Sequence, residues 1–110
     1  MQKWVHSIDR LMTEELYIFQ IDVRETAKMY VLETDKKEER ISFNGKRNTV
    51  DSLMGYSSRY PKDNRFSDTY EEARTKLRDQ LEARRNVAQR QLEYVEDLIE
   101  TFNSVAYVKQ

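Results

Sequence analysis

Apolar and polar side chains alternate through residues 16–24, and this period of two predicts a β-strand with one buried face. The candidates for that buried face are Tyr17, Phe19, Ile21 and Val23. A β-rich run resumes at Met29–Leu32, and Arg40–Phe43 is a further short run of the same kind. We therefore expect strands at all three places.

Asn44 and Gly45 give the strongest local signal in the chain. Both residue types tolerate positive φ, which a type I′ hairpin turn requires at its two central positions. Residues 46–50 are therefore expected to run back beside Arg40–Phe43 as an antiparallel strand. Residues 51–66 include Gly55 and Pro61, and we expect them to form an ordered but irregular loop.

Helical spacing occurs at the start of the chain. Trp4, Ile8 and Leu11 or Met12 recur at intervals of three or four residues. This spacing predicts a short amphipathic helix at residues 1–13. Because it would have only about three turns, its stability would depend on docking its apolar stripe against the rest of the domain.

A much longer helix is predicted over residues 69–105. Thr69 and Glu72 fit a capping box, in which the Thr hydroxyl accepts from the Glu amide and the Glu side chain reaches back to the Thr amide. Neither Gly nor Pro occurs between Lys62 and Gln110. The apolar stripe of this helix consists of Tyr70, Ala73, Leu77, Leu81, Ala88, Leu92, Val95, Ile99 and Phe102.

Arg84 interrupts that stripe, since at 100° per residue it falls among the apolar positions. Either the helix breaks at Arg84–Asn86 and forms an αα-hairpin, or Arg84 faces a partner or ligand. An unbroken helix from Thr69 to Phe102 would be about 50 Å long, more than a small sheet can cover. Its far end must then bend back, extend into solvent or pack against another chain. We expect a homo-oligomer formed through this helix.

These elements predict an α+β fold in a single domain spanning residues 1–110. The N-terminal helix occupies 1–13, the sheet and its loop 16–66, and the long C-terminal helix 69–105. We expect a small antiparallel sheet of three to five strands, which could close into an SH3-like barrel.

The composition of the chain limits the kinds of functional site that it can contain. The 110 residues carry 19 Lys and Arg against 20 Asp and Glu, so a net charge of −1 disfavours non-specific binding to nucleic acid. The chain has no cysteine and one histidine, His6, which excludes thiolate sites and multi-histidine metal sites. No catalytic motif is present and no apolar run is long enough to cross a membrane. We expect no enzyme activity, catalytic residue, metal or cofactor, and no membrane partner.

Basic and aromatic residues that could bind a ligand cluster in two places. In such a set, Arg can grip phosphate oxygens while an aromatic ring stacks on a base. The alternative is that the aromatics cover the sheet and the charges are merely solvated. The candidate ligand-binding residues are Lys46, Arg47, Tyr56, Arg59, Tyr60, Arg65, Arg74 and Arg78.

Three segments also carry a family resemblance: Val23–Leu32, Ser67–Ala73 and the helix Leu77–Phe102. Across residues 16–105 the order of elements resembles small bacteriophage accessory proteins, in which a compact antiparallel sheet precedes a capped C-terminal helix. In outline it is similar to the Thoeris anti-defence sponges, which sequester a cyclic nucleotide signal between subunits through arginines and aromatics. No binding motif of that family aligns residue by residue, so the resemblance implies a class rather than a site.

The resemblance implies a non-enzymatic phage protein in the host cytoplasm that counteracts defence by stoichiometric binding. It would sequester a small anionic nucleotide signal or inhibit a host defence protein. A small nucleic-acid-binding regulator that uses the Lys46–Phe66 loop is the alternative.

Overall fold

The computed structural model describes residues 1–9 and 14–105 of the chain. The chain forms two compact units, Met1–Leu77 and Arg78–Gln110. The elements in order are β1 (Gln2–Asp9), β2 (Glu15–Glu25), β3 (Met29–Leu32), β4 (Glu39–Ile41), β5 (Arg47–Thr49), α1 (Val50–Met54), β6 (Arg59–Pro61), β7 (Phe66–Ser67) and α2 (Tyr70–Ser104).

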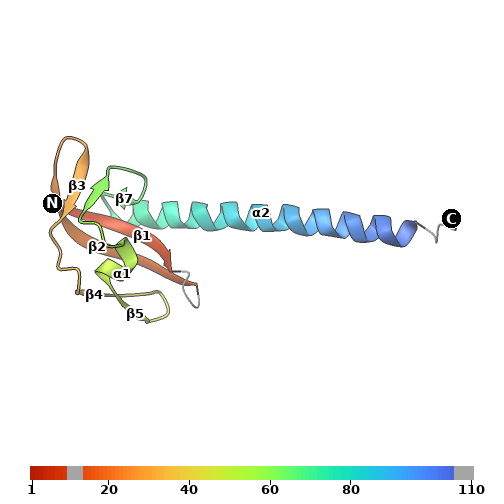
Figure 1. Cartoon of the computed structure of the whole chain (residues 1–110), viewed down its shortest axis with the longest axis horizontal. Helices are drawn as coiled ribbons and strands as arrows, with labels where there is room; N and C mark the ends of the chain where they lie inside the picture. Colours follow the sequence, from red (N-terminus) through yellow and green to blue (C-terminus); the bar gives the residue numbers. More distant parts are fainter. Residues whose placement is uncertain (10–13, 106–110) are drawn as a thin grey trace. The chain divides into compact units, whose positions relative to one another are not determined.

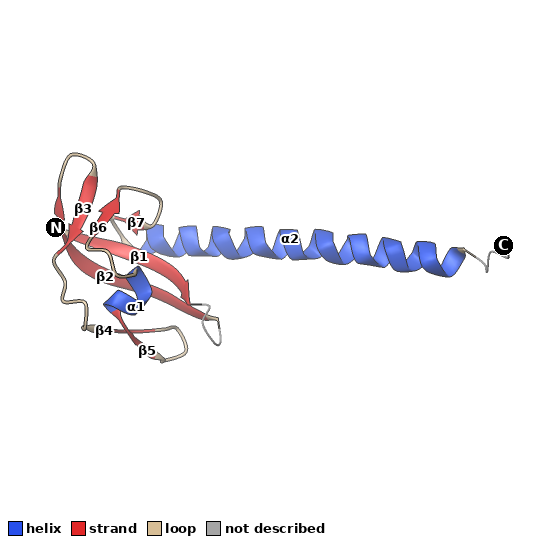
Figure 2. Ribbon diagram, in the orientation of Figure 1, coloured by secondary structure: helices blue, strands red, loops and turns tan. Residues whose placement is uncertain are grey.

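Five of the strands form one antiparallel sheet in the order β6-β3-β2-β1-β7 (Figure 1). This sheet curls into a half-barrel, with β6 and β7 as its two edges among the described strands. Strands β4 and β5 pair separately as a two-stranded sheet (Figure 2). The predicted α+β fold, an antiparallel sheet followed by a long C-terminal helix, is confirmed, and the curled sheet stops short of a closed SH3-like barrel.

The predicted N-terminal helix is wrong, because Gln2–Asp9 is strand β1. This strand pairs with β2 along its whole length, from Gln2 opposite Asp22 to Asp9 opposite Glu15. An interval of four residues, such as Trp4 to Ile8, places side chains on one face of a helix and equally on one face of a strand. The spacing therefore could not distinguish the two structures. Leu11 and Met12 lie outside the described residues.

The alternation in β2 is confirmed, since its alternate positions are buried from Glu15 to Val23. This face meets aromatic side chains from the neighbouring strands, and α1 covers it with Val50 and Met54. Tyr30 and Phe66 meet edge to face with ring centroids 5.0 Å apart. The core cluster consists of Val5, Tyr17, Phe19, Ile21, Val23, Tyr30, Val50, Met54, Tyr60 and Phe66.

The segment 51–66 was expected to be an ordered but irregular loop, and it has more regular structure than that. It contains most of helix α1, all of strand β6 and the first residue of β7. Buried Met54, Tyr60 and Phe66 anchor it to the core, and β6 pairs with β3. Elements this short leave too little periodicity in the sequence to be recognised.

The hairpin at Asn44 is confirmed, but its turn is not type I′. Gly45 has φ +85°, whereas Asn44 does not have positive φ. The Ser42 amide donates to the Lys46 carbonyl oxygen at 2.7 Å, so the loop has three residues and ends on a left-handed glycine. The Ser42 hydroxyl oxygen accepts from the amides of Asn44 and Lys46 at 3.2 and 2.9 Å, which stabilises this wider loop.

Helix α2 is continuous from Tyr70 to Ser104 and has no break at Arg84. The Glu72 amide donates to the Thr69 hydroxyl oxygen at 3.1 Å, as the capping box predicts. The reciprocal bond differs, because the Glu72 carboxylate accepts from the Asp68 amide at 3.2 Å instead of the Thr69 amide.

Replacing Phe19 tests the importance of the core. We expect Phe19→Ala to lower the free energy of unfolding by about 3–5 kcal/mol, because the change leaves a cavity in a core of few residues. Urea denaturation measures this. Tyr56→Ala is the control and should change stability by less than about 0.5 kcal/mol, since Tyr56 is 92% exposed. Equal losses in both variants would show that Phe19 is not part of a packed core.

Candidate functional site

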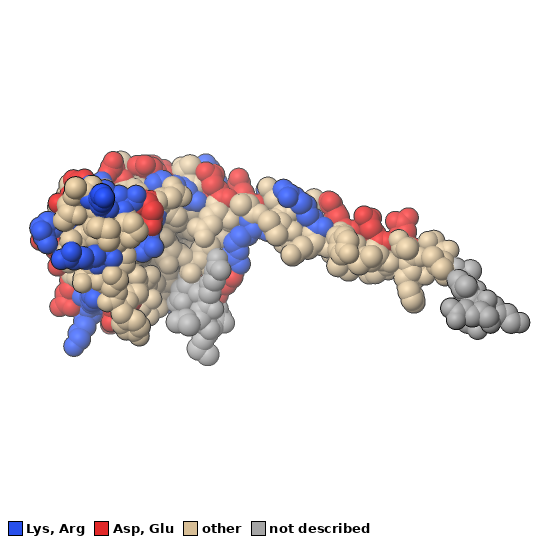
Figure 3. All heavy atoms as spheres, turned by 45° about the horizontal axis from the view of Figure 1, so that its top comes forward, with Lys and Arg blue, Asp and Glu red and all other residues tan. Residues whose placement is uncertain are grey.

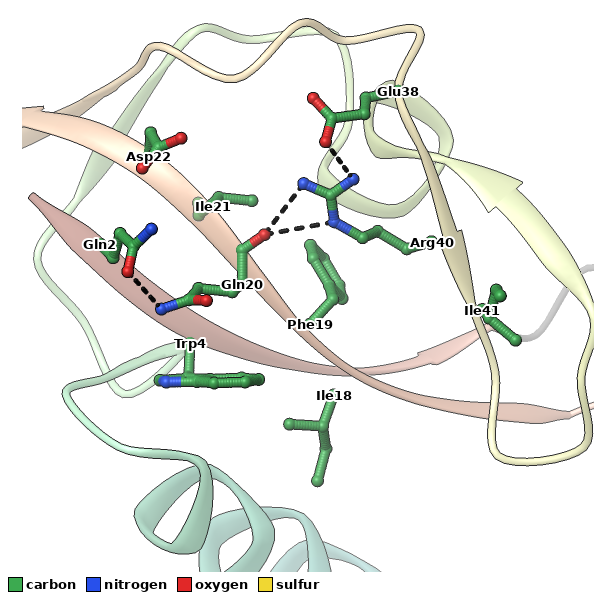
Figure 4. Close-up of a pocket in the computed structure, with 10 residues that line it drawn as sticks. All are labelled: Gln2, Trp4, Ile18, Phe19, Gln20, Ile21, Asp22, Glu38, Arg40 and Ile41. Atoms are coloured by element: carbon green, nitrogen blue, oxygen red, sulfur yellow. Dashed lines mark hydrogen bonds and ion pairs between the residues drawn. The ribbon is translucent and has the colours of Figure 1, made fainter.

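A hollow of about 420 Å³ lies on the face of β1 and β2 opposite the core (Figure 4). The Trp4 indole lines it and meets the Tyr70 ring edge to face, with ring centroids 5.5 Å apart. Gln20 Nε2 donates to Gln2 Oε1 at 2.8 Å across the floor of the hollow. The residues that line it are Gln2, Trp4, Ile18, Phe19, Gln20, Ile21, Asp22, Glu38, Arg40 and Ile41.

Arg40 brings a positive charge to this hollow, but its guanidinium already has partners. Its Nε and Nη2 donate to the Gln20 carbonyl oxygen at 3.2 and 3.0 Å. Its Nη1 donates to Glu38 Oε1 at 2.8 Å and to the Glu39 carbonyl oxygen at 2.9 Å. The two bonds to the Gln20 carbonyl oxygen hold β4 against β2. The hollow therefore offers an aromatic ring, side-chain amides and the Asp22 carboxylate, and its positive charge is already compensated.

Tyr60 was expected to stack on a ligand, and the structure corrects this expectation. Its side chain is only 3% exposed and belongs to the core. Its hydroxyl donates to the Ser57 carbonyl oxygen at 2.5 Å, and burial raises the pKa of Tyr60. The Arg65 guanidinium lies 5.3 Å from the ring centroid and 3.8 Å from Asp63. Tyr60 and Arg65 thus meet each other, but the buried ring has no face free for a base.

The other predicted residues of the first unit are dispersed. Lys46 and Arg47 lie on the β4–β5 hairpin, with Glu15 and Glu39 each 3.8 Å away. The hairpin lies well apart from β6, which carries Arg59 (Figure 2).

Three predicted residues remain. Tyr56 is exposed in the segment between α1 and β6. Arg74 Nη1 donates to the Tyr70 hydroxyl oxygen at 3.2 Å on α2. Arg78 is exposed and begins the second unit. Of the predicted set, Tyr60 and Arg65 are the pair whose contact is seen among the described residues of the first unit.

Sequence reasoning missed a cationic cluster around Tyr30. The ammonium groups of Lys3 and Lys62 lie 5.3 and 5.4 Å from its ring centroid, beside a hollow of about 170 Å³. Lys3 is paired with Asp68, and Lys62 with Glu25 at 2.6 Å. The charges of this cluster are therefore balanced. These residues are far apart in the sequence and share no motif, so only the folded sheet reveals the cluster.

The second unit carries an exposed apolar face. Along residues 78–104 of α2, large apolar side chains gather on one side of the helix and are 48% to 79% exposed. They are Val87, Leu92, Val95, Leu98, Ile99 and Phe102. We call them, together with Leu81 and Ala88, the stem face. Charged side chains lie along the rest of this helix segment, basic ones giving way to acidic ones toward Ser104 (Figure 3).

The described part of the chain contains neither a cluster of metal ligands nor a membrane-spanning helix. No group of three His, Asp or Glu side chains within residues 1–9 and 14–105 is placed to hold a metal ion. Neither helix in these ranges is both long and apolar enough to cross a bilayer.

Comparison with known proteins adds no relative to this picture. No protein-family model matches the chain, and neither a curated protein nor a solved structure matches it.

His6 is the one histidine and lies on β1. Its Nδ1 is buried and has no hydrogen-bond partner among the described residues. Burial lowers the pKa of His6, the positive charge of Lys76 lowers it further, and Asp63 raises it in part. The folded protein therefore favours the neutral imidazole.

This preference makes stability depend on pH. The unfolded chain takes up a proton on His6 near pH 6.5 while the folded chain resists it, so stability should fall as the pH drops below about 6.5. Chemical denaturation between about pH 7.5 and 5 should show a steeper loss for the native sequence than for His6→Leu. Parallel curves for the two proteins would contradict the lowered pKa.

Proposed function

We propose that the protein works by stoichiometric binding rather than catalysis, and that the stem face joins it to another polypeptide. The observation that carries this proposal is the row of exposed large apolar side chains on residues 78–104. Burying apolar surface contributes roughly 25 cal/mol per Å². A contiguous apolar stripe bordered by charged residues is typical of a surface that a protein partner covers.

A protein partner fits the molecule better than a nucleotide alone. The arginines and aromatics expected to hold a nucleotide are spread over the β4–β5 hairpin, β6 and α2. Tyr60, one of the two predicted rings, is buried. The stem face instead offers apolar side chains at helical spacing, which match a helix or an apolar groove of another chain.

The biological setting we propose is counter-defence by a phage protein in the host cytoplasm. It rests on the resemblance in element order to phage accessory proteins such as the anti-defence sponges. In this setting the stem face assembles the protein, and the assembled particle blocks a host defence protein or sequesters its signal.

Phage plating tests this setting. Expression of the chain in bacteria that carry defence systems should restore plating against one of them. Ile99→Asp should abolish the restoration, because a carboxylate placed within an apolar contact costs several kcal/mol unless it is paired. Asn86→Asp is the matched control, since it adds the same charge on the opposite side of α2 and should preserve the restoration.

Two results would contradict the proposal. Failure to restore plating across a broad panel of defence systems would remove the counter-defence setting. Full restoration by Ile99→Asp, with the helix intact by circular dichroism, would show that the stem face is not the binding surface.

A nucleic-acid-binding regulator is the alternative, and exposed Tyr56 near Arg59 favours it locally. The whole chain has a net charge of −1, however, so few counterions would be released on binding to a duplex. We expect no gel shift with duplex DNA at physiological salt. Tight binding that weakens steeply with salt would instead support this alternative.

A further inference from the structure

Residues 78–104, which we call the stem segment, have their basic and acidic side chains separated along the helix. Residues 78–90 carry four arginines and two acidic residues, whereas residues 91–104 carry four acidic residues and no basic one. The arginines are Arg78, Arg84, Arg85 and Arg90, and the acidic residues of the second half are Glu93, Glu96, Asp97 and Glu100. The segment therefore has a basic half and an acidic half that share one apolar face.

This separation decides how two such helices can pair. In a parallel pair, the acidic half of one copy would lie beside the acidic half of the other, and like charges repel. In an antiparallel pair, each acidic half lies beside a basic half. We infer that the stem face binds a second copy of this chain in the antiparallel direction. This inference rests on the proposed function, because it names the partner of the same surface.

The register follows from the apolar residues. A two-fold axis between Gln91 and Leu92 sets Ala88 level with Val95 of the second copy, a small side chain against a larger one. It also sets Leu81 level with Phe102. The apolar residues of both halves are then covered over the length of the segment, about 40 Å at 1.5 Å per residue.

The same register explains why an arginine lies in the stripe. Arg84 becomes level with Ile99 of the second copy, within its acidic half. In a parallel pair with matched ends, two Arg84 side chains would meet in the seam, where unpaired charge is costly. The aliphatic part of Arg84 can pack in the seam while its guanidinium reaches the border.

The helix geometry predicts one kind of ion pair between the two copies. Arg85 and Glu96 are eleven residues apart, so at 100° per residue they lie within about 20° of each other on one flank of the stem face. A two-fold axis across an antiparallel pair brings like flanks together. Arg85 of each copy therefore lies beside Glu96 of the other, which gives two equivalent ion pairs.

Cysteine cross-linking tests the direction, and the chain suits it because it has no cysteine of its own. Ala88→Cys and Val95→Cys are prepared separately, mixed and oxidised. Antiparallel pairing predicts a disulfide-linked dimer in the mixture and none in either protein alone. Two residues 88 would be about 10 Å apart along the axis, and a disulfide requires Cα atoms within about 7 Å.

Each other outcome overturns the inference. Cross-linking of both variants alone would indicate parallel pairing, and cross-linking of one alone would place the two-fold axis at that residue and overturn this register. No cross-link in the mixture, together with a 13.3 kDa particle by light scattering of the native chain at tens of micromolar, would show that the stem face binds a different polypeptide.

Charge reversal tests the register. Glu96→Arg and Arg85→Glu should each weaken dimerisation about tenfold, because each change introduces two repulsive contacts per dimer. The double variant should recover most of the affinity. Asp97→Arg is the matched control, since it makes the same charge change one position away, on the side of the helix that faces away from the second copy, and should weaken dimerisation less. Equal weakening by Asp97→Arg and Glu96→Arg, or no recovery in the double variant, would overturn this register.

The two proposals fail in distinguishable ways. A dimer that restores no phage plating keeps the inference and removes the counter-defence setting. A monomer whose plating activity still depends on Ile99 keeps the proposed function and removes the second copy as partner.

Discussion

The pairing of β1 with β2 is the contact on which the first unit depends. The two strands match along the whole of β1, and each supports one further neighbour, β7 beside β1 and β3 beside β2. The amino group of Met1 donates to the Val23 carbonyl oxygen at 2.9 Å, which extends the ladder by one bond. With only 38% hydrophobic residues in the chain, this continuous ladder positions the few large side chains that form the core.

The sequence predicted elements where one period was unambiguous. Alternation through Tyr17–Val23 identified the buried face of β2, and steps of three and four identified α2 together with its cap at Thr69. The prediction failed at β1 because the spacing of Trp4 and Ile8 fits the period of a helix and also that of a strand. Pairing with the long strand β2 makes this segment a strand. The prediction also missed α1 and β6, whose order comes from contacts such as that of Tyr60 with Phe66.

The candidate site also has one part that local spacing predicts and one part that it does not. The apolar stripe on α2 could be read from local spacing, and its large members are exposed on residues 78–104. The basic and aromatic set could not be assembled from sequence, because its members lie on separate elements and their roles depend on distant contacts. Tyr60 lies in the core, and Lys3 and Lys62 meet only because the sheet brings both beside Tyr30.

The edges of the curled sheet have a consequence for behaviour at high concentration. Strand β6 has three residues and ends on Pro61, which lacks an amide hydrogen, and β7 has only two residues. Short edges and proline are poor templates for adding another strand, so they protect a β protein from edge-to-edge aggregation. The short outer strands thus disfavour uncontrolled growth of the sheet, whereas the association that we propose uses a helix, whose partner would saturate the surface instead of extending it.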